Sequence, residues 1–361
     1  MSLTATLRQP AEAFVREEAA PPAPAVAVPA TKAGTVFRFH WFGLAAVAAW
    51  ALLGAIALLL PDKPAGFVEE WPYTREFGLG ALAVAALWLL ATVAASFRGL
   101  SGKVEFVADV FRYSVPWLVV LGLGLALWEA LTAKTGVLEP PFFAPPSSIF
   151  DAYAQHYALL ADSAFNSLKL LAKGVFWGAT VGFVVGVSIG WSRRANYWIH
   201  PILRLLGPLP PTALLPIAFF FFPTSHAASV FLIALATGFP VAILTWSGVA
   251  GVNKAYYDVA RTLGASDWFL VFRVAVPAAL PQVFVGLFMG LGSSFVVLIV
   301  AEMMGVKSGL GWYLEWAKGY ADYVNMYGAL IVMTIIFSSL ISLLFAVRDR
   351  VLVWQKGIVK W

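Results

Sequence analysis

Residue types that could carry catalytic chemistry are few in this chain, and their spacing does not assemble a reaction centre. The segment Gly99–Val104 comes nearest to a phosphate-binding loop but lacks the spacing and the hydroxyl after its lysine. The chain has no cysteine, and its four histidines are scattered, which argues against a metal site or histidine-based catalysis. They are His40, His156, His200 and His226. The sequence therefore predicts a protein that is not an enzyme, holds no cofactor and does not hydrolyse ATP alone.

A short polar segment between two hydrophobic stretches carries the most informative spacing. It reads Asp258-Val259-Ala260, three residues, Gly264, nine residues, and Val274-Ala275-Val276-Pro277. Gly264 can end a first short helix, because glycine adopts the left-handed conformation at little cost. The segment predicts a helix, a turn and a second helix beside the membrane.

The second helix of this segment is expected over Trp268–Val276. Ser266 or Asp267 can cap its start by accepting a backbone N–H bond. The helix should stop or bend at Pro277 and Pro281, because proline has no N–H to donate. We interpret this helix–turn–helix segment as a protrusion that inserts into the cleft of a partner protein. The alternative interpretation is an ordinary amphipathic connecting loop.

The elements that position this segment are membrane helices. The 361 residues are 61% hydrophobic and 12% charged, with a mean hydropathy of +0.82, which excludes a soluble globular protein. A spanning helix needs about 20 apolar residues. Eight stretches qualify: Trp41–Leu60, Gly78–Phe97, Tyr113–Leu131, Leu168–Trp191, Trp198–Phe222, Ser229–Gly248, Gln282–Met304 and Met326–Val347.

The distribution of Lys and Arg predicts the orientation of these spans. With the N-terminus in the cytoplasm, 17 of the 24 basic residues fall on the inner side and seven on the outer side. Both termini and the Asp258–Pro277 segment are then cytoplasmic. This topology explains the net charge of +5 without a nucleic-acid partner.

Three irregular features fall within the predicted spans. Six prolines lie between positions 201 and 223, and a broken backbone belongs against protein or a water-filled cavity, so we expect Pro210, Pro211 and Pro216 to border a transport path. A kinked packing helix is the alternative. Two rows of small residues predict close helix packing, with pore lining as the alternative. They are Gly178, Gly182, Gly186 and Gly190, and Gly286, Gly290 and Gly292 with Ser293 and Ser294.

Glu302 lies at the end of the seventh predicted span and precedes a glycine-rich turn. One interpretation is that its charge simply reaches water at a helix end. The other is a pairing that shapes an outer gate, because carboxylates near the membrane interior are usually functional.

Three motifs occur together in one order: Leu209–Pro216, Asp258–Pro277 with Pro281, and Ala301–Gly305 leading to Ser308–Gly311. Together they resemble the nitrate/sulfonate/taurine/bicarbonate branch of ATP-binding cassette (ABC) importer permeases, the inner-membrane components of binding-protein-dependent transport systems. In that family, Glu-Ala-Ala, three residues, Gly, nine residues, Ile-x-Leu-Pro docks onto a separate ATPase. Here Asp replaces Glu and Val replaces the first Ala, Ile and Leu. The resemblance runs from Phe111 to the C-terminus.

The resemblance implies an all-α integral membrane protein with a type I ABC importer permease-like core of about six transmembrane helices, here with two extra N-terminal ones. It divides the chain into a flexible cytoplasmic tail (1–38), a two-helix membrane extension (39–110) and a permease domain (111–361) with a coupling loop at 254–281. The coupling residues it implies are Asp258, Ala260, Gly264, Ala265, Pro277 and Pro281.

The resemblance also implies the partners and the activity. The chain is expected in a bacterial inner membrane with a second copy of itself, two cytoplasmic ATPase subunits that bind ATP and Mg, and a periplasmic substrate-binding protein. It would import a small anion such as a sulfonate, taurine or nitrate by alternating access. Two alternatives stay open: a secondary transporter or channel with no ATPase, and a membrane scaffold protein.

Overall fold

The computed structural model describes residues 36–37, 41–63, 71–98, 103–207 and 209–354, so the predicted tail, apart from Val36–Phe37, lies outside the described residues. Within them the protein is helical, with one antiparallel pair of two-residue strands, β1 (Val36–Phe37) and β2 (Phe97–Arg98). The helices are α1 (Trp41–Leu59), α2 (Thr74–Ser96), α3 (Lys103–Glu129) with a π turn (Ala130–Lys134), α4 (Pro146–Trp191), α5 (Arg193–Leu206), a 3₁₀ turn η2 (Pro211–Leu214), α6 (Leu215–Phe221), α7 (Ser225–Ala250), α8 (Lys254–Thr262), α9 (Asp267–Phe269), a π turn η3 (Leu270–Ala275), α10 (Val276–Met304), α11 (Leu310–Gly319) and α12 (Tyr323–Val351). The predicted all-α class is confirmed.

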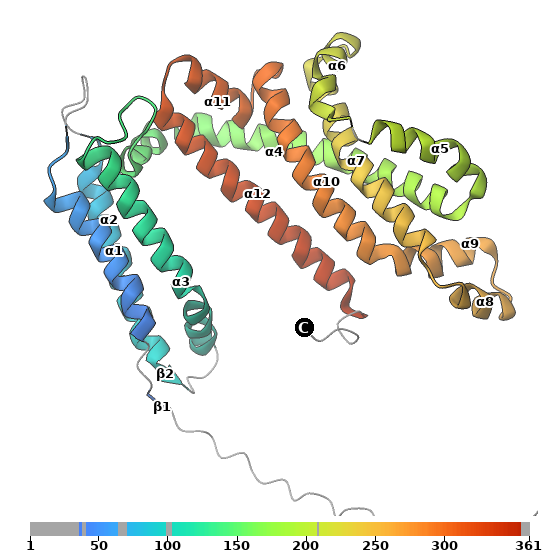
Figure 1. The fold of residues 1–361 in the computed structure, drawn as a ribbon, viewed down its shortest axis with the longest axis horizontal. Helices are drawn as coiled ribbons and strands as arrows, with labels where there is room; N and C mark the ends of the chain where they lie inside the picture. The colour runs from blue at the N-terminus through green and yellow to red at the C-terminus, as the bar shows by residue number, and fades with distance from the viewer. Residues whose placement is uncertain (1–35, 38–40, 64–70, 99–102, 208, 355–361) are drawn as a thin grey trace, which may run out of the picture.

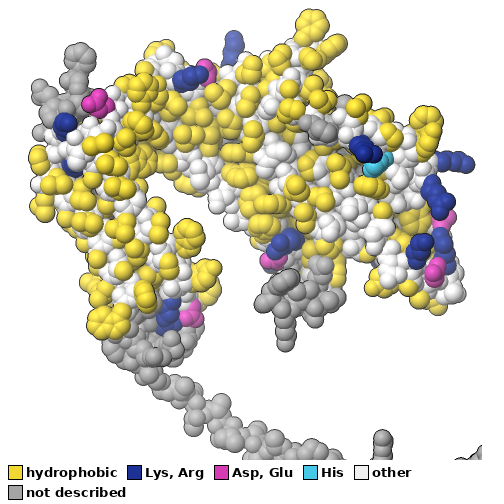
Figure 2. Space-filling model, in the orientation of Figure 1, with side chains coloured by type: hydrophobic (Ala, Val, Ile, Leu, Met, Phe, Trp, Pro, Cys, Tyr) yellow, Lys and Arg dark blue, Asp and Glu magenta, His cyan; other side chains and the backbone are white. Residues whose placement is uncertain are grey.

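Seven helices of the described part are long and apolar enough to cross a membrane. They are α1, α2, α3 with its π turn, α4, α7, the continuous stretch from α9 through α10, and α12. Hydrophobic side chains cover the lateral surface, and charged side chains gather towards the ends of the helices (Figure 2). This distribution is typical of a protein embedded in a bilayer.

The predicted fifth span, Trp198–Phe222, is wrong as a single helix. The chain forms α5, leaves the helical conformation near Pro210, and continues as η2 and α6. Proline at 210 and 211 explains the break, because neither residue can donate the N–H that a continuous helix needs.

The stretch from α5 through η2 to α6, here called the broken segment, nevertheless connects opposite ends of the bundle. A Cβ added to Gly174 would meet Ile233, and one added to Gly190 would meet Val249, so α4 and α7 run parallel. The residues between them must therefore return from the end of α4 to the start of α7. Because the chain crosses the bundle once more at this point, α1 begins and α12 ends on the same side of the molecule (Figure 1). We call this side, which also carries α8 and α9, the loop end, and the opposite side the α11 end.

The glycine rows are packing surfaces, as predicted. A Cβ on Gly182 or Gly186 would lie 2.6 Å from a carbonyl oxygen of α7, so the absent side chains let α4 and α7 approach closely. Gly286 and Gly290 pack against α7 from α10 in the same way. Gly292 differs, because a Cβ there would meet open space.

The first three helices form a bundle of their own beside the rest of the protein (Figure 1). Trp50 Nε1 donates to the Leu118 carbonyl at 3.1 Å, and α3 also packs on α2 through Trp88 and Phe111. The predicted domain boundary after residue 110 therefore falls inside α3. At the α11 end, the buried Lys134 ammonium bonds the Ala57 and Leu60 carbonyls and pairs with Asp62 at 2.7 Å.

Removal of residues 1–100 is expected to leave assembly and transport in place, because α1 and α2 do not reach the loop between Asp258 and Pro277 (Figure 1). Lys134 then loses three acceptors, so the thermal unfolding midpoint of the truncated chain should fall. Uptake by the truncated and full chains in proteoliposomes checks the prediction. Normal insertion and assembly without uptake would show that α1 and α2 take part in the mechanism.

Candidate functional site

The coupling loop, residues 254–281 around the Asp258–Pro277 motif, begins with α8 and turns at Gly264. Gly264 has φ +82°, in the left-handed region, as its predicted role as a helix end requires. The Gly264 N–H bonds the Arg261 carbonyl at 2.9 Å, and the Ala265 N–H bonds the Ala260 carbonyl at 3.0 Å. This pair of bonds is a Schellman motif, which satisfies the last carbonyls of α8 and fixes the direction of the chain.

The second half of the loop runs directly into a membrane helix. Of the two predicted capping residues, Ser266 caps α9, because its hydroxyl accepts the Phe269 N–H at 3.4 Å. α9, η3 and α10 follow without a break, so the helix does not stop at Pro277. The Val276 N–H bonds the Val271 carbonyl five residues back, a π turn that widens the helix just before the proline and makes room for its ring.

One face of the loop is fixed to the membrane helices. Leu270 and Ala275 are fully buried, and Ala275 packs with Val249 of α7. The Tyr257 ring of α8 meets Trp191 at the end of α4, edge to face, with ring centroids 5.7 Å apart. Burial raises the pKa of the Tyr257 phenol above its usual value. These contacts attach the loop to α4, α7 and α10.

The other face of the loop is exposed and carries large apolar side chains. Leu263 is 83% exposed and Trp268 is 74% exposed, and Trp268 stacks on Phe272 with the ring planes 8° apart. The predicted coupling residue Asp258 is exposed as well, whereas Ala260 and Ala265 are half-buried. Exposed apolar groups on an otherwise polar loop are typical of a protein contact surface.

Glu302 lies at the far end of α10 and is almost completely buried, at 1% exposure. The interpretation that its charge reaches water is wrong. The Ser167 hydroxyl of α4 bonds its two carboxylate oxygens, at 2.7 and 2.8 Å, and the Gly311 N–H of α11 donates to it at 2.8 Å. The Leu310 N–H donates to the same Ser167 hydroxyl at 2.8 Å. Glu302 thus pairs as the second interpretation expected, joining α4, α10 and the start of α11.

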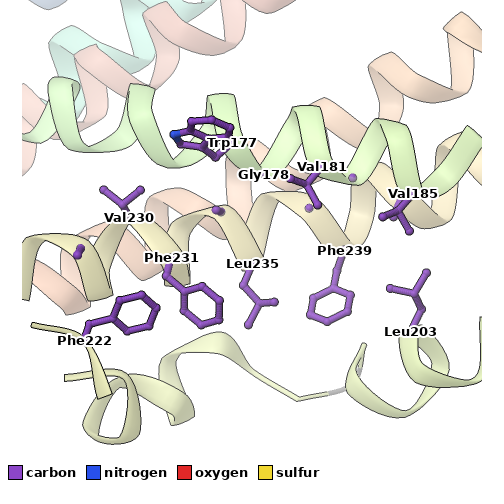
Figure 3. Close-up of a pocket in the computed structure, with 15 residues that line it drawn as sticks. Trp177, Gly178, Val181, Val185, Leu203, Phe222, Val230, Phe231, Leu235 and Phe239 are labelled. Carbon is purple, nitrogen blue, oxygen red and sulfur yellow. The ribbon is translucent and has the colours of Figure 1, made fainter. Parts of the chain in front are cut away.

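The broken segment between α5 and α7 borders an apolar cavity of about 460 Å³. Figure 3 shows side chains of α7, among them Phe231, Leu235 and Phe239, extending towards the segment. Leu203 and Phe222 line the cavity from the two ends of the segment. Among the described residues, Pro210, Pro211 and Pro216 do not line it; Pro210 and Pro216 are exposed and Pro211 is half-buried.

Sequence analysis did not identify three residues that contribute to these sites. Ser167 is 135 residues from Glu302, and no local pattern marks it. Asn253 starts α8 by accepting the Ala255 N–H at 3.0 Å, and an Asn before a helical run is a signal that could have revealed it. Trp191 supports Tyr257 only because α4 ends beside α8.

A multi-pass helical membrane protein with a capped, exposed loop at one end fits the architecture of a membrane transport permease. Residues 178–352 match the family model described as binding-protein-dependent transport system inner membrane component. The chain belongs to this family, the permeases of ABC transporters.

Curated relatives agree with the family match. An ABC transporter permease protein of Brucella abortus is 30% identical over 241 residues, which cover 66% of this chain and 95% of that protein. TauC of Escherichia coli, a taurine transport system permease protein, is 28% identical over 68% of this chain and 93% of its own length. SsuC of Bacillus subtilis, named as a transport permease for aliphatic sulfonates, is 27% identical over 64% of this chain and 85% of its own length.

Proposed function

We propose that this chain is the permease subunit of an ATP-driven importer that moves a small anion from the periplasm to the cytoplasm. The coupling loop carries the proposal: one face is exposed and apolar, and the other is buried against three membrane helices. A loop built in this way can receive a movement from a partner and pass it on. The family membership supports ATP, bound with Mg by separate ATPase subunits, as the source of that movement.

The proposed assembly contains two copies of this chain, two cytoplasmic ATPase subunits and a periplasmic binding protein. The ATPase would bind the exposed face formed by Leu263, Trp268 and their neighbours. Pro210 is exposed at the break after α5 and Pro216 is exposed in the first turn of α6, where they would face the second copy and border the path. The apolar cavity behind the break gives this segment room to move.

The coupling runs along α10 in this proposal. Its 29 residues are about 44 Å long, and about 39 Å of that length separates the loop from Glu302 at the α11 end. Closure of the ATPase dimer on ATP displaces the coupling loop, and α10 carries the displacement to Glu302. The bonds from Glu302 to Ser167 and Gly311 then move α11 with α4 and α10, which would open the outer side of the path.

The substrate class follows from the relatives. Two of them are named for taurine and for aliphatic sulfonates, and we infer a small organic or inorganic anion, with sulfonates, taurine and nitrate as the first compounds to test. Proteoliposomes containing the permease, its ATPase and its binding protein should accumulate one of these anions only when ATP is present. Accumulation by the permease alone in response to an ion gradient would instead identify a secondary transporter.

We expect both termini and the coupling loop to face the cytoplasm, because 17 of the 24 basic residues then lie on the inner side. Single-cysteine labelling measures the orientation directly, since the chain has no native cysteine. A cysteine at the exposed Ser266 should react with an impermeant maleimide only after the cells are opened, whereas one at the exposed Lys307 should react in intact cells with a permeable outer membrane. Labelling of Ser266 from the periplasm would reverse the orientation.

A further inference from the structure

Helix α5 carries a charged side chain into the membrane. The helix starts where α4 ends and runs back alongside α4 and α7 as part of the broken segment. Leu203 of α5 lines the apolar cavity together with Val185 of α4 and Phe239 of α7 (Figure 3). Those two residues lie six and 11 residues before the ends of their helices, or about 9 and 16 Å inside the loop end. Arg204 follows Leu203 directly, so it lies at a depth that belongs to the hydrocarbon core, which is about 30 Å thick.

Arg204 has no acidic partner among the described residues. It is exposed, and the ion pairs of the described part of the chain do not include it. Helices α5, α6 and α7 and the turn η2 contain neither Asp nor Glu. In α10, Glu302 is buried at the far end, where Ser167 and Gly311 bond it. A cation this deep in a membrane usually faces the protein interior or a water-filled cavity.

A second copy of the described core, from α4 to α12, offers Arg204 no carboxylate at this depth either. Asp151 and Asp162 lie in the first 17 residues of α4, towards the α11 end, and Asp349 lies in the last turn of α12. The other carboxylates of this core, apart from Glu302, lie in the coupling loop or beside α11. The charge of Arg204 is therefore left for an anion that is not part of this core.

The side of α5 that bears Arg204 carries a polar group in each turn. Arg193, Tyr197 and Arg204 recur at the spacing of one side of a helix, and His200 lies one turn before Arg204. Arg193, Tyr197 and His200 also line a surface hollow of about 680 Å³. Ile202, on the other side, is apolar and 55% exposed, as a side that faces lipid requires. A polar helix side inside a membrane belongs against water or protein, so this side of α5 fits the wall of a water-filled path.

We propose that Arg204 binds the transported anion in the inner half of the path and thereby helps the permease to select an oxyanion. The guanidinium is always charged and offers two parallel N–H donors to the oxygens of a sulfonate or nitrate group. One such contact holds an anion but still allows its release, as passage through a membrane requires. The inference rests on the proposed function and names a residue that meets its substrate.

Cysteine labelling tests whether Arg204 faces water, because the chain has no native cysteine. In inside-out membrane vesicles without ATP, a cysteine that replaces Arg204 should react with the impermeant reagent 2-sulfonatoethyl methanethiosulfonate. A cysteine that replaces Ile202, at nearly the same depth on the lipid side, should react at least about 10-fold more slowly, because apolar surroundings keep a thiol protonated. Equal rates at the two positions, or no reaction at position 204, would overturn the proposal.

Uptake measures the contact with the solute. Proteoliposomes that contain the permease, its ATPase and its binding protein are supplied with ATP and with taurine or nitrate. Arg204→Gln should reduce uptake about 10-fold, the loss expected for one charge-assisted hydrogen bond, and Arg204→Lys should lose less. Arg194→Gln removes the same charge at the exposed start of α5 and should transport like wild type. Arg204→Cys labelled before reconstitution with a trimethylammonium thiol reagent should recover uptake, whereas the sulfonate reagent should not restore it.

The outcomes separate this inference from the proposed function. ATP-driven anion uptake that is unchanged in Arg204→Gln would overturn the role of Arg204 and leave the proposed function standing. So would a loss that neither lysine nor the trimethylammonium label restores, because Arg204 would then act through structure alone. Equal losses in Arg204→Gln and Arg194→Gln would mean that net charge, not the position of Arg204, matters. Absence of ATP-dependent anion uptake by the wild-type assembly would reject the proposed function itself, and the solute-binding role with it.

Discussion

Uptake is expected to disappear in the Gly264→Asp variant, while insertion and dimerisation persist. Gly264 has φ +82°, where a side chain costs about 1 kcal/mol or more. A Cβ at this position meets nothing within 4 Å, so the substitution does not clash within the chain. The new carboxylate instead projects from the exposed surface, where it would hold the loop out of the ATPase cleft. Substrate uptake and co-purification of the ATPase measure the effect.

Two further variants separate the contact surface from the backbone conformation. Gly264→Ala keeps the backbone cost but adds little bulk, and it should lose less ATPase binding than Gly264→Asp. Ala260→Arg adds bulk one residue before Arg261 and should also weaken binding. Lys307→Ala, at the α11 end, should leave binding unchanged. Normal ATPase association and uptake in both Gly264→Asp and Ala260→Arg would show that the loop is not the docking element.

A second large effect is expected at Glu302. Glu302→Ala removes the acceptor of the Ser167 hydroxyl and the Gly311 N–H, both in a buried site. Each buried donor without a partner costs about 1–3 kcal/mol, so the unfolding free energy should fall by roughly 3 kcal/mol. Glu302→Gln keeps one acceptor oxygen and nearly the same volume, and it should lose less. Thermal unfolding of the purified permease measures the order wild type, Glu302→Gln, Glu302→Ala.

Glu315 provides the matched control for this series. It is only half-buried on α11 and pairs with the exposed Lys318 at 3.4 Å, so Glu315→Ala should change stability little. Equal unfolding midpoints for Glu302→Ala and Glu315→Ala would contradict the bracing role of Glu302. A normal uptake rate in a stable Glu302→Ala variant would remove Glu302 from the proposed outer gate.

The parts of the site that sequence analysis predicted are those set by local chemistry. Gly264 ends α8 because glycine alone adopts positive φ at little cost, and Ser266 starts α9 because its hydroxyl replaces a missing backbone acceptor. The glycines of α4 were predictable as a packing face because their four-residue spacing places them on one side of a helix. The proposed docking role of the loop is tested by the Gly264 and Ala260 variants above.

The parts that escaped prediction depend on contacts between distant segments. Hydropathy alone predicted one spanning helix over Trp198–Phe222, although the prolines of that stretch already indicated an irregular backbone. Glu302 follows the last apolar turn of α10, where water is the usual neighbour. Its burial results from Ser167 of α4 and the turn before α11, which close over it only in the folded protein.

Photo-crosslinking in intact cells tests the central claim, that the coupling loop binds the ATPase. A photoreactive amino acid replaces the exposed Trp268 in one permease and the exposed Lys307 at the opposite end in another, with the ATPase co-expressed in both. The account predicts an ATPase adduct from position 268 and none from position 307. Absence of the adduct at 268, or equal adducts at both positions, would contradict it.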